Sequence, residues 1–515
     1  MSSHRRIRLA LALCAIALLP AYAAAQDLAS FEKSVTEFTL GNGLHFIILE
    51  RHDAPVVSFH TFANAGSVDD PKGQTGLAHM FEHMAFKGTP IIGSTDWARE
   101  KVALDAVDEA YEAWLQERHK GIHADEARVS ELRKAFQDSI EKAAAFAEGE
   151  EFTRLIEQSG GTGLNASTSS DETQYFYSLP SNRAELWFYL ESERFLNPVF
   201  RDFYKERDVV REERRMRTES SPVGKLIEAF LAASYQAHPY GWPPVGWASD
   251  IDNFGVPEAR EFFKTYYAPV NLTIAIAGDV DPARMKSLAQ AYFGRLEKRP
   301  PPPAVLTEEP QQLGERRIEI ESQAQPLVVI GFKKPSKLHP DRAVFDVISS
   351  ILSDGRTSWL YTDLVRDRQI ALQAGGFPDF PGSKYTSLFL FYAFPTSGHS
   401  VAENEKAMYG LIDKMRNEPV DAETLNRVKA KARANLIGAL DSNAGLARQL
   451  ASNEAGYGDW RQLFRWLDEM NKVTAEDVQR VAREYFKKEN RTVAYLVPPS
   501  EEPQLAPASP KESAQ

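Results

Sequence analysis

Cysteine is nearly missing from this sequence, since the only thiol among its 515 residues is that of Cys14. Cys14 lies in an N-terminal segment that we expect to be removed, so the mature chain would contain no cysteine. Disulfides and thiolate metal ligands are thereby excluded. Any metal ion that this chain binds must use histidine and carboxylate side chains.

The N-terminal segment MSSHRRIRLALALCAIALLPAYAAAQ predicts a signal peptide over residues 1–25. Three arginines precede the apolar run at 9–19, and small residues follow as a cleavage site. Cleavage after Ala23 and cleavage after Ala25 both fit the pattern, and an uncleaved anchor is the alternative. The expected location of the mature protein is therefore periplasmic or secreted.

Long apolar runs and an excess of positive charge are also lacking. Beyond the first residues, no apolar run approaches the roughly 20 residues that cross a bilayer, so no membrane span is predicted. The formal charge of −12 becomes −15 without the three arginines of residues 1–25, a segment that contains no acidic residue. A chain this acidic is a poor match for nucleic acid, so no nucleic-acid partner is expected.

The length and a proline-rich segment divide the mature chain into two parts. A chain of 515 residues exceeds what one hydrophobic core supports. Residues 300–303 are consecutive prolines, which can join neither a helix interior nor a central strand. We therefore expect domains at 26–298 and 313–498, a linker at 299–312 and a disordered tail at 499–515.

Strand and helix patterns in both parts predict an α+β fold. FTLGNGLHFIILE places the turn pair Asn42-Gly43 between apolar stretches, which indicates a hairpin. Residues 272–277 form a short apolar run closed by a turn, as a buried strand does. QPLVVIGFKKPSKLHPDRAVFDVISSILSDG repeats the strand, turn and helix order of APVVSFHTFANAGSVDDPKGQTGLAHMFEHMAFKG without its histidines. We interpret this as a pseudo-repeat, although two unrelated αβ units could be alike by chance.

The segment GLAHMFEHMAFKGT, residues 76–89, carries the clearest functional pattern. His79 and His83 lie four residues apart, so on a helix their imidazoles share one face and can reach one ion. Glu82 lies beside them, close enough to reach a water on that ion. This order is the H-x-x-E-H pattern of the inverzincin zinc peptidases.

The alternative is a surface helix that carries these three residues by accident. The segment is largely apolar, however, with Leu77, Met80 and Phe81 among its residues. Burying three ionisable groups in such a helix is costly unless they are paired or bound to a metal. We therefore predict a site for one zinc ion per chain, which needs three protein ligands and an open position if it is catalytic.

These residues resemble the pitrilysin/insulinase family of zinc peptidases, which includes the mitochondrial processing peptidases. The likeness continues through NAST, KERDVVREE, HPYGWPPVGW and YYAPVNLTIAIAGDVD. It covers nearly all of the first part of the mature chain and, more weakly, the second. The resemblance implies two homologous αβ-roll domains, each a mostly antiparallel sheet packed with helices and joined by the proline-rich linker.

In this family the third zinc ligand is a glutamate seven residues after another glutamate on a later helix, which maps onto Glu213 and Glu206. Seven residues are nearly two helical turns, so these two share a face, whereas Glu212 points about 100° away. Glu213 is thus the expected ligand, and Glu206 would orient a ligand or help proton transfer. A run of solvated charges is the alternative for both.

Residues 97–157 are rich in Ala, Glu, Lys and Leu at helical spacing and predict long solvent-facing helices without a catalytic pattern. Glu213 follows His83 by 130 residues, about fifty more than is usual for the family. The surplus matches this helical stretch, so we interpret it as an insertion that would cap the site or face a partner.

The resemblance implies a zinc-dependent endopeptidase that hydrolyses peptides or small unfolded polypeptides. Glu82 would take a proton from the zinc-bound water and pass it to the leaving amine, so it is assigned as general base and acid. An extended substrate would add to the edge of a sheet beside the metal. That edge maps onto the NAST residues, and a plain edge strand is the alternative; they are Asn165, Ala166, Ser167 and Thr168.

The family also supplies an Arg and a Tyr from a C-terminal domain, on an L-R-x-K-x-x-L-x-Y pattern. The matching LVRDRQIAL has Val365 and Leu372 at those positions. Arg366 or Arg368 could replace the arginine through a register shift, but neither brings a tyrosine. We therefore expect a heterodimer in which a related subunit supplies the pair, with a homodimer as the alternative. The competing function is that of a non-catalytic peptide-binding or structural subunit.

Overall fold

The computed structural model describes residues 31–499, and these form two compact units. The predicted signal peptide and, apart from Pro499, the predicted tail lie outside the described residues. The first unit runs to Arg214 and also includes Trp242–Thr307 and Lys429–Lys472. The second comprises Arg215–Gly241, Glu308–Val428 and the chain from Val473 onward. Between residues 31 and 499 no helix combines the length and the apolar character needed to cross a membrane.

The first unit is built on a six-stranded sheet with the order β1-β2-β6-β3-β5-β4. β1 and β2 form the hairpin predicted around Asn42-Gly43, where Gly43 has a φ of 99° that suits glycine. β6 is the predicted buried strand. Only β2 and β6 run parallel, and the other neighbours are antiparallel. The strands are β1 (Val35–Thr39), β2 (His45–Glu50), β3 (Val56–Ala63), β4 (Thr162–Thr168), β5 (Thr173–Pro180) and β6 (Leu272–Gly278).

The second unit is built on a five-stranded sheet with the order β7-β11-β8-β10-β9. Its order and strand directions repeat those of β2-β6-β3-β5-β4, including one parallel pair, β7 with β11. A helix follows β8, as one follows β3. The pseudo-repeat of two mostly antiparallel αβ domains is therefore confirmed. The strands are β7 (Arg316–Glu321), β8 (Leu327–Lys334), β9 (Ala371–Phe380), β10 (Ser387–Pro395) and β11 (Arg491–Val497).

Both faces of the first sheet are covered by helices, as its alternating side chains require. Phe46 and Ile48 of β2 lie in the larger core, whereas Ile47 and Leu49 face the other way and pack against Leu450 of α15 (Asn443–Tyr457). The helices that contribute to the larger core include α2 (Leu77–Met84), α6 (Ala184–Leu196), α7 (Phe203–Arg214), α10 (Val256–Tyr266) and α11 (Pro282–Phe293), together with the short α9 (Ala248–Ile251) and the three helices between residues 97 and 158.

The second sheet is covered on one side by α8 (Pro222–Ser234), which contacts β7 and β11. Its other helices are α12 (Arg342–Ser353), α13 (Val401–Asn417) and α17 (Ala475–Tyr485), and α14 (Ala422–Ala439) and α16 (Gln462–Lys472) complete the chain.

The two compact units are not the two contiguous segments that the sequence suggests. α8 lies in the first half of the chain and covers the second sheet, whereas α15 lies in the second half and covers the first. The first unit therefore takes Lys429–Lys472, which contains α15 and α16, from the second half of the chain, and the second unit takes Arg215–Gly241, which contains α8, from the first half. Local sequence patterns do not encode this long-range exchange. Residues 299–312 contain neither helix nor strand, as expected of a linker.

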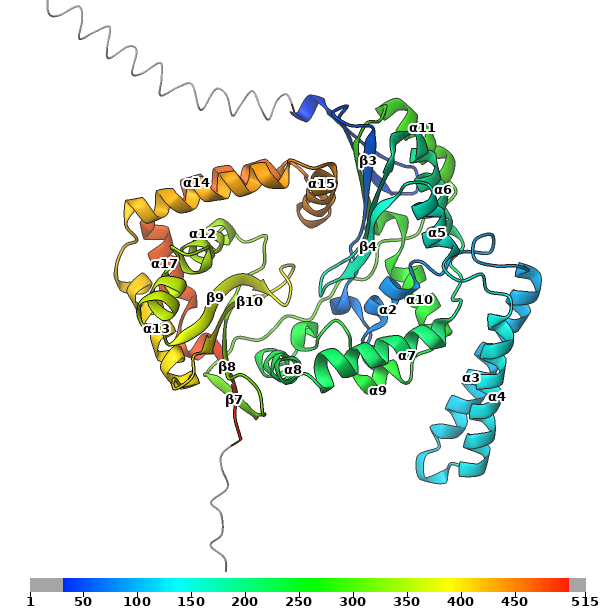
Figure 1. Ribbon diagram of the computed structural model, residues 1–515, viewed down its shortest axis with the longest axis horizontal. Coiled ribbons are helices and arrows are strands. Elements are labelled where there is room, and N and C mark those ends of the chain that lie inside the picture. The colour runs from blue at the N-terminus through cyan, green and yellow to red at the C-terminus, as the bar shows by residue number, and fades with distance from the viewer. Residues whose placement is uncertain (1–30, 500–515) are drawn as a thin grey trace, which may run out of the picture. The chain divides into compact units, whose positions relative to one another are not determined.

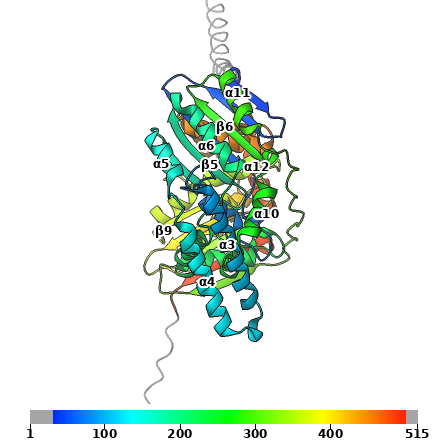
Figure 2. The ribbon, with the colours of Figure 1, turned by 90° about the vertical axis from the view of Figure 1, so that its right-hand side faces the viewer.

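The predicted helical stretch at 97–157 forms α3 (Trp97–Arg118), α4 (Glu126–Ala144) and α5 (Glu151–Gln158). α3 and α4 pack side by side as a hairpin that projects from the first unit, as both ribbon views show (Figures 1 and 2). Only three residues of the 22 in α3 are buried, so this pair is largely solvent-facing, as predicted.

Candidate metal centre

Two helices of the first unit bring the three predicted ligands together. α2 presents His79 and His83, α7 presents Glu213, and one ligand atom from each lies within 4.8 Å of the others. Glu213 Oε2 is 3.5 Å from His79 Nε2 and 3.2 Å from His83 Nε2. Ligand atoms of a tetrahedral zinc site, each about 2.0–2.2 Å from the ion, lie about 3.3–3.6 Å apart. The geometry and the nitrogen and oxygen donors therefore fit zinc.

Glu206 lies on the same face of α7 as Glu213 and contacts the predicted ligand His83. Its Oε2 is 3.5 Å from His83 Nδ1, and its Oε1 accepts a hydrogen bond of 2.5 Å from Lys87 Nζ. Burial disfavours charge on His83, but the hydrogen bonds to Glu206 and Glu213 outweigh it and raise the pKa of His83 to about 9. Against the opposing effect of burial, His83 and Lys87 lower the pKa of Glu206. Glu206 is placed to orient His83, as the sequence suggests.

Lys87 was not singled out from the sequence, although a signal for it exists. It lies four residues after His83, as His83 lies four after His79, a regular spacing that continues past the end of α2 at Met84. Its ammonium group holds the carboxylate of Glu206 beside the imidazole of His83.

A buried aspartate fixes the start of α2. Asp70 is only 5% exposed, and its carboxylate accepts hydrogen bonds from the backbone N–H groups of Gly76, at 2.7 Å, and Ala78, at 2.9 Å. These two groups belong to the first helical turn, which has no intrahelical acceptors for them. Asp70 thus caps the turn that leads directly into His79.

The segment HPYGWPPVGW, which carried part of the family likeness, packs against the same helix end. Gly246 has a φ of 77°, and a Cβ atom there would lie 2.2 Å from the Thr75 carbonyl oxygen. The Thr75 hydroxyl donates to Asp250, at 2.8 Å, and accepts from the Trp247 N–H. The Gly246 carbonyl in turn accepts from Arg214, the residue after Glu213. This loop therefore ties α2 to the end of α7.

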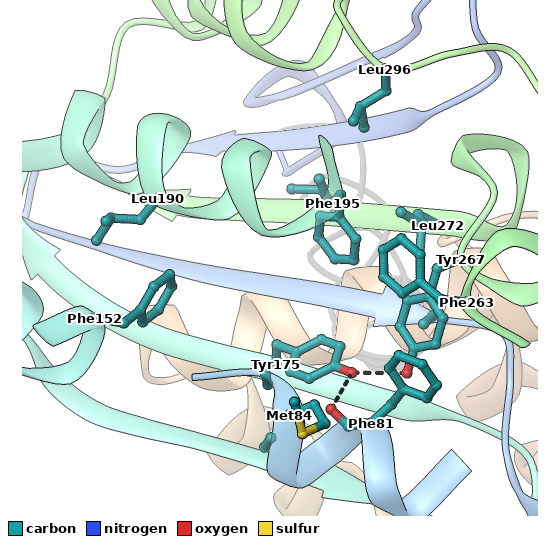
Figure 3. Close-up of a cluster of buried hydrophobic side chains, with 14 of the residues drawn as sticks. Phe81, Met84, Phe152, Tyr175, Leu190, Phe195, Phe263, Tyr267, Leu272 and Leu296 are labelled. Carbon is teal, nitrogen blue, oxygen red and sulfur yellow. Dashed lines mark hydrogen bonds between the residues drawn. The ribbon is translucent and has the colours of Figure 1, made fainter. Parts of the chain in front are cut away.

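The middle of α2 is held by an aromatic cluster (Figure 3). Phe81 stacks on Phe262, with ring centroids 5.6 Å apart, and contacts Tyr267 at 5.2 Å. The Tyr175 hydroxyl reaches the Phe81 carbonyl oxygen, at 3.4 Å, and the Tyr267 hydroxyl, at 2.8 Å, so β5 and the end of α10 are joined to α2. The buried Arg194 donates to the carbonyl of Ala85 just after the helix.

α7 is held in place by the helical hairpin. The buried Arg207 donates to the Tyr111 hydroxyl of α3, at 2.6 Å, and to the Phe254 carbonyl, at 3.0 Å. Tyr111 and Tyr204 of α7 also contact each other, with ring centroids 4.5 Å apart. The predicted insertion therefore packs directly on the helix that carries Glu213.

Glu82 is half-buried on α2, one residue before His83. Burial, with a smaller contribution from the charge of Glu82, raises the pKa of Tyr267 to about 12, against the opposing effects of two hydrogen bonds and of the charge of Arg194. The charge of Glu82 is thus felt by Tyr267 in the aromatic cluster, and Glu82 lies on the same helix as His79 and His83.

The NAST residues lie in β4, the last strand in the order of the first sheet. They are the part of β4 that pairs continuously with β5. They pair with residues 173–176 of β5, and a register irregularity separates them from Thr162. Asn165 and Ser167 are exposed, and α2 contacts this strand. The predicted edge strand beside the histidine helix is therefore present, and its opposite edge pairs with no strand in residues 31–499.

The positions that match the family's Arg and Tyr lie in the second unit. Val365 falls in a short π-helix, Tyr361–Asp367, and Leu372 lies on β9 with 60% of its surface exposed. Arg366 and Arg368 make surface ion pairs with Asp367 and Asp363. Neither arginine is accompanied by a tyrosine within residues 364–372.

Two family models match the chain. The model described as "Insulinase (Peptidase family M16)" matches residues 46–119 and 141–245, and the model described as "Peptidase M16 inactive domain" matches 253–432. The first includes His79, His83 and Glu213, and its gap, residues 120–140, lies in the helical hairpin.

Relatives and solved structures agree with these matches. A zinc protease of Helicobacter pylori, PqqE, is 29% identical over 89% of this chain and 92% of its own. The zinc protease YmxG of Bacillus subtilis is 21% identical over 88% and 96%. The structure of a protease from Helicobacter pylori has a TM-score of 0.75 at 26% identity and covers 90% of this chain and 99% of its own.

The fold, the paired histidines and these likenesses define a protein of the zinc metalloprotease class. Within that class, the chain belongs to peptidase family M16, the insulinase family.

Proposed function

We propose that this chain is an active zinc-dependent endopeptidase that cleaves peptides or small unfolded polypeptides. The observation that carries the proposal is the convergence of His79, His83 and Glu213 on one point, with Glu82 on the same helix. A structural role alone would not require three ligand atoms at the spacing of a zinc site together with an adjacent half-buried carboxylate.

When bound, the zinc ion supplies Lewis-acid chemistry: it acidifies a water molecule and polarises the peptide carbonyl. Glu82 accepts the proton of that water and returns it to the amine that leaves. Glu206 and Lys87 hold the imidazole of His83 in the orientation in which Nε2 faces Glu213. The residues of α2 and α7 thus divide into ligands, a proton carrier and positioning groups.

The substrate would bind as an added strand along β4. The NAST segment offers backbone N–H and C=O groups on the side that does not face β5, and α2 lies beside it. Main-chain pairing of this kind binds extended peptides with little dependence on their sequence. Folded proteins would be excluded, because their backbone groups are already paired.

The complete enzyme would be a heterodimer with a related subunit that supplies an arginine and a tyrosine. Val365 and Leu372 have no side-chain donor for a substrate carbonyl, so stabilisation that depends on such donors must come from another chain or be absent. A homodimer would lack the pair as well. We also propose a periplasmic or secreted location, supported by the signal pattern of residues 1–25.

A non-catalytic role is the second candidate, and one observation favours it: the second half matches a model described as an inactive domain. That match covers residues 253–432, whereas all four site residues lie within the range of the insulinase model. A subunit that only binds peptides would not need Glu82 beside a complete ligand set.

Hydrolysis of a quenched fluorescent peptide library separates the two candidates. With the related subunit present, Glu82→Gln should retain zinc and lose activity by about 10³-fold or more, since it removes the proton acceptor and preserves shape. His79→Ala/His83→Ala should lose the ion held between α2 and α7 and, with it, the activity. Glu212→Gln, an exposed neighbour of Glu213, is the matched control and should keep both properties. Normal turnover by Glu82→Gln with zinc bound would contradict the proposal.

A further inference from the structure

A second group of metal-ligating side chains lies on the other face of the first sheet. Glu37 of β1, His45 of β2 and Glu454 of α15 place one ligand atom each within 4.8 Å of the others. His45 Nε2 and Glu454 Oε1 are 3.5 Å apart, the separation also found between His79 and Glu213. None of the three takes part in the candidate metal centre on α2 and α7.

The hairpin register explains why these residues meet. Thr39 lies opposite His45, and Glu37 lies opposite Ile47, so all four side chains point to one face. Ile47 packs against α15 on that face, and Glu454 lies on the same helix. The sheet and the helix thus approach one point from two sides.

The imidazole ring of His45 is held with Nε2 directed at Glu454. His45 Nδ1 is 2.9 Å from the Thr39 hydroxyl, which fixes the ring. His45 Nε2 is a buried atom for which residues 31–499 provide no hydrogen-bond partner, and the nearby acceptor is Glu454 Oε1. Outer hydrogen bonds of this kind orient metal-binding imidazoles.

Trp460 fixes both carboxylates through one oxygen each. Its indole N–H donates to Glu37 Oε2 and its backbone N–H to Glu454 Oε2, each at 2.9 Å. Oε1 of Glu454 is left facing His45, and Oε1 of Glu37 has only a long contact, 3.4 Å, with Arg461. Oε1 of Glu454 therefore faces the imidazole, and a carboxylate oxygen of Glu37 lies within 4.8 Å of the other two ligand atoms.

The net charge of the side chains around Glu37, His45 and Glu454 is negative, which favours binding of a divalent cation. Ion pairs join the carboxylates of Glu32, Glu37 and Asp459 to the guanidinium groups of Arg461 and Arg465, and the fourth carboxylate, that of Glu454, faces His45. With His45 neutral, the cluster carries two more negative than positive charges. The side chains of Glu454 and His45 are 17% and 22% exposed and that of Glu37 is 40% exposed, so an ion has a path from solvent.

We propose that Glu37, His45 and Glu454 form a second metal site, which takes a divalent transition metal ion such as zinc. Imidazole and carboxylate groups are both zinc donors, and an imidazole disfavours calcium and magnesium, which prefer oxygen ligands. An ion bound here joins α15 to the β1–β2 hairpin. It stabilises the packing of a helix that comes from the second half of the chain, and it does not depend on peptidase activity.

The surface histidine His52 shows what a non-binding arrangement looks like. Its two ring nitrogens are each taken by a different carboxylate, Nε2 by Glu50 at 2.9 Å and Nδ1 by Asp279 at 2.7 Å. These acceptors lie on opposite sides of the ring and cannot share one ion with it. His52→Gln is therefore a matched control for His45→Gln.

The test uses the full chain carrying His79→Ala/His83→Ala, so that the first site is absent. Equilibrium dialysis against zinc should give about one ion per chain, and zinc should raise the temperature of unfolding. Adding His45→Gln or Glu454→Gln should remove both the bound ion and the thermal shift, whereas adding His52→Gln should change neither. Calcium at the same concentration should not bind.

Three outcomes would overturn the proposal. They are no zinc bound by a folded His79→Ala/His83→Ala chain, equal binding with and without His45→Gln, and binding of calcium as tightly as zinc, which would indicate a general acidic surface. Circular dichroism of each variant verifies folding. Because the readout is metal content and not hydrolysis, failure here leaves the proposed peptidase function untouched.

Discussion

Replacement of Asp70 by alanine tests whether a distant cap builds the metal centre. Asp70 contacts none of the predicted ligands but accepts hydrogen bonds from Gly76 and Ala78, directly before His79. Asp70→Ala leaves two N–H groups without their acceptor in a region where water has little access. Each orphaned buried group costs about 1–3 kcal/mol, so the gross loss is about 2–6 kcal/mol.

The net loss should fall in the lower half of that range. Burial raises the pKa of Asp70 well above its usual value, against the effect of its two backbone hydrogen bonds, so keeping this carboxylate charged already has a cost that alanine removes. We expect a destabilisation of about 2–3 kcal/mol, concentrated in α2. Loosening of the first turn shifts His79 and should weaken zinc binding about 10-fold to 100-fold, as loss of supporting groups does at other metal sites.

Asp125→Ala is the control, because Asp125 caps α4 with the same number of hydrogen bonds in an exposed setting. It accepts from Ala127 at 3.0 Å and from Arg128 at 3.2 Å. Water can replace these bonds, so we expect about 0.5–1 kcal/mol and no change in zinc affinity. Competition with a chromophoric chelator measures the affinity, and hydrogen exchange of the α2 amides measures the local stability. Equal effects of the two substitutions on both quantities would refute the reasoning.

Two further predictions concern assembly and pH. The purified chain alone should be a poor peptidase, and adding a related subunit with the Arg/Tyr pair should raise kcat/KM. Ultracentrifugation verifies that the chain alone is a monomer or homodimer. If that chain cleaves peptides as fast as the mixture, the proposal that a partner supplies the pair is wrong. His60 is 2% exposed, and burial lowers its pKa from 6.5 to about 4. As pH falls, the unfolded chain therefore protonates His60 before the folded chain does. The free energy of unfolding should decrease by about 3 kcal/mol between pH 6.5 and pH 4. His60→Gln should flatten this part of a thermal unfolding profile, and an unchanged profile would show that other groups cause it.

Much of the metal centre could be predicted because its information is local. The spacing of His79 and His83 defines a helix face. The assignment of Glu213 and Glu206 rests on the resemblance to the insulinase family, and their seven-residue interval agrees with one face of α7. The hairpin at Asn42-Gly43 and the exposed helices at 97–157 likewise follow from turn chemistry and helical composition.

The supporting contacts could not be predicted, because they join residues far apart in the sequence. The bond from Arg214 to the Gly246 carbonyl and that from Arg207 to Tyr111 depend on the packed fold. The capping role of Asp70 could not be predicted either. A standard N-cap side chain accepts from an N–H group two or three residues later, whereas the Asp70 carboxylate accepts from the N–H of Gly76, six residues later, across a loop. The exchange of α8 and α15 between units has no local signature at all.

That exchange determines how this protein could be divided. A fragment that ends in the proline-rich linker would keep the histidines and Glu213 but lose α15, leaving the sheet side chains beneath it open to water; they include Ile47, Leu49, Phe62, Ala275 and Ala277. Such a fragment would aggregate rather than act as a miniature protease. A nick in the same linker should do little harm, because each piece retains a helix that the other needs. The two halves of this gene product are therefore candidates for a split enzyme that regains its structure only when both pieces are made together.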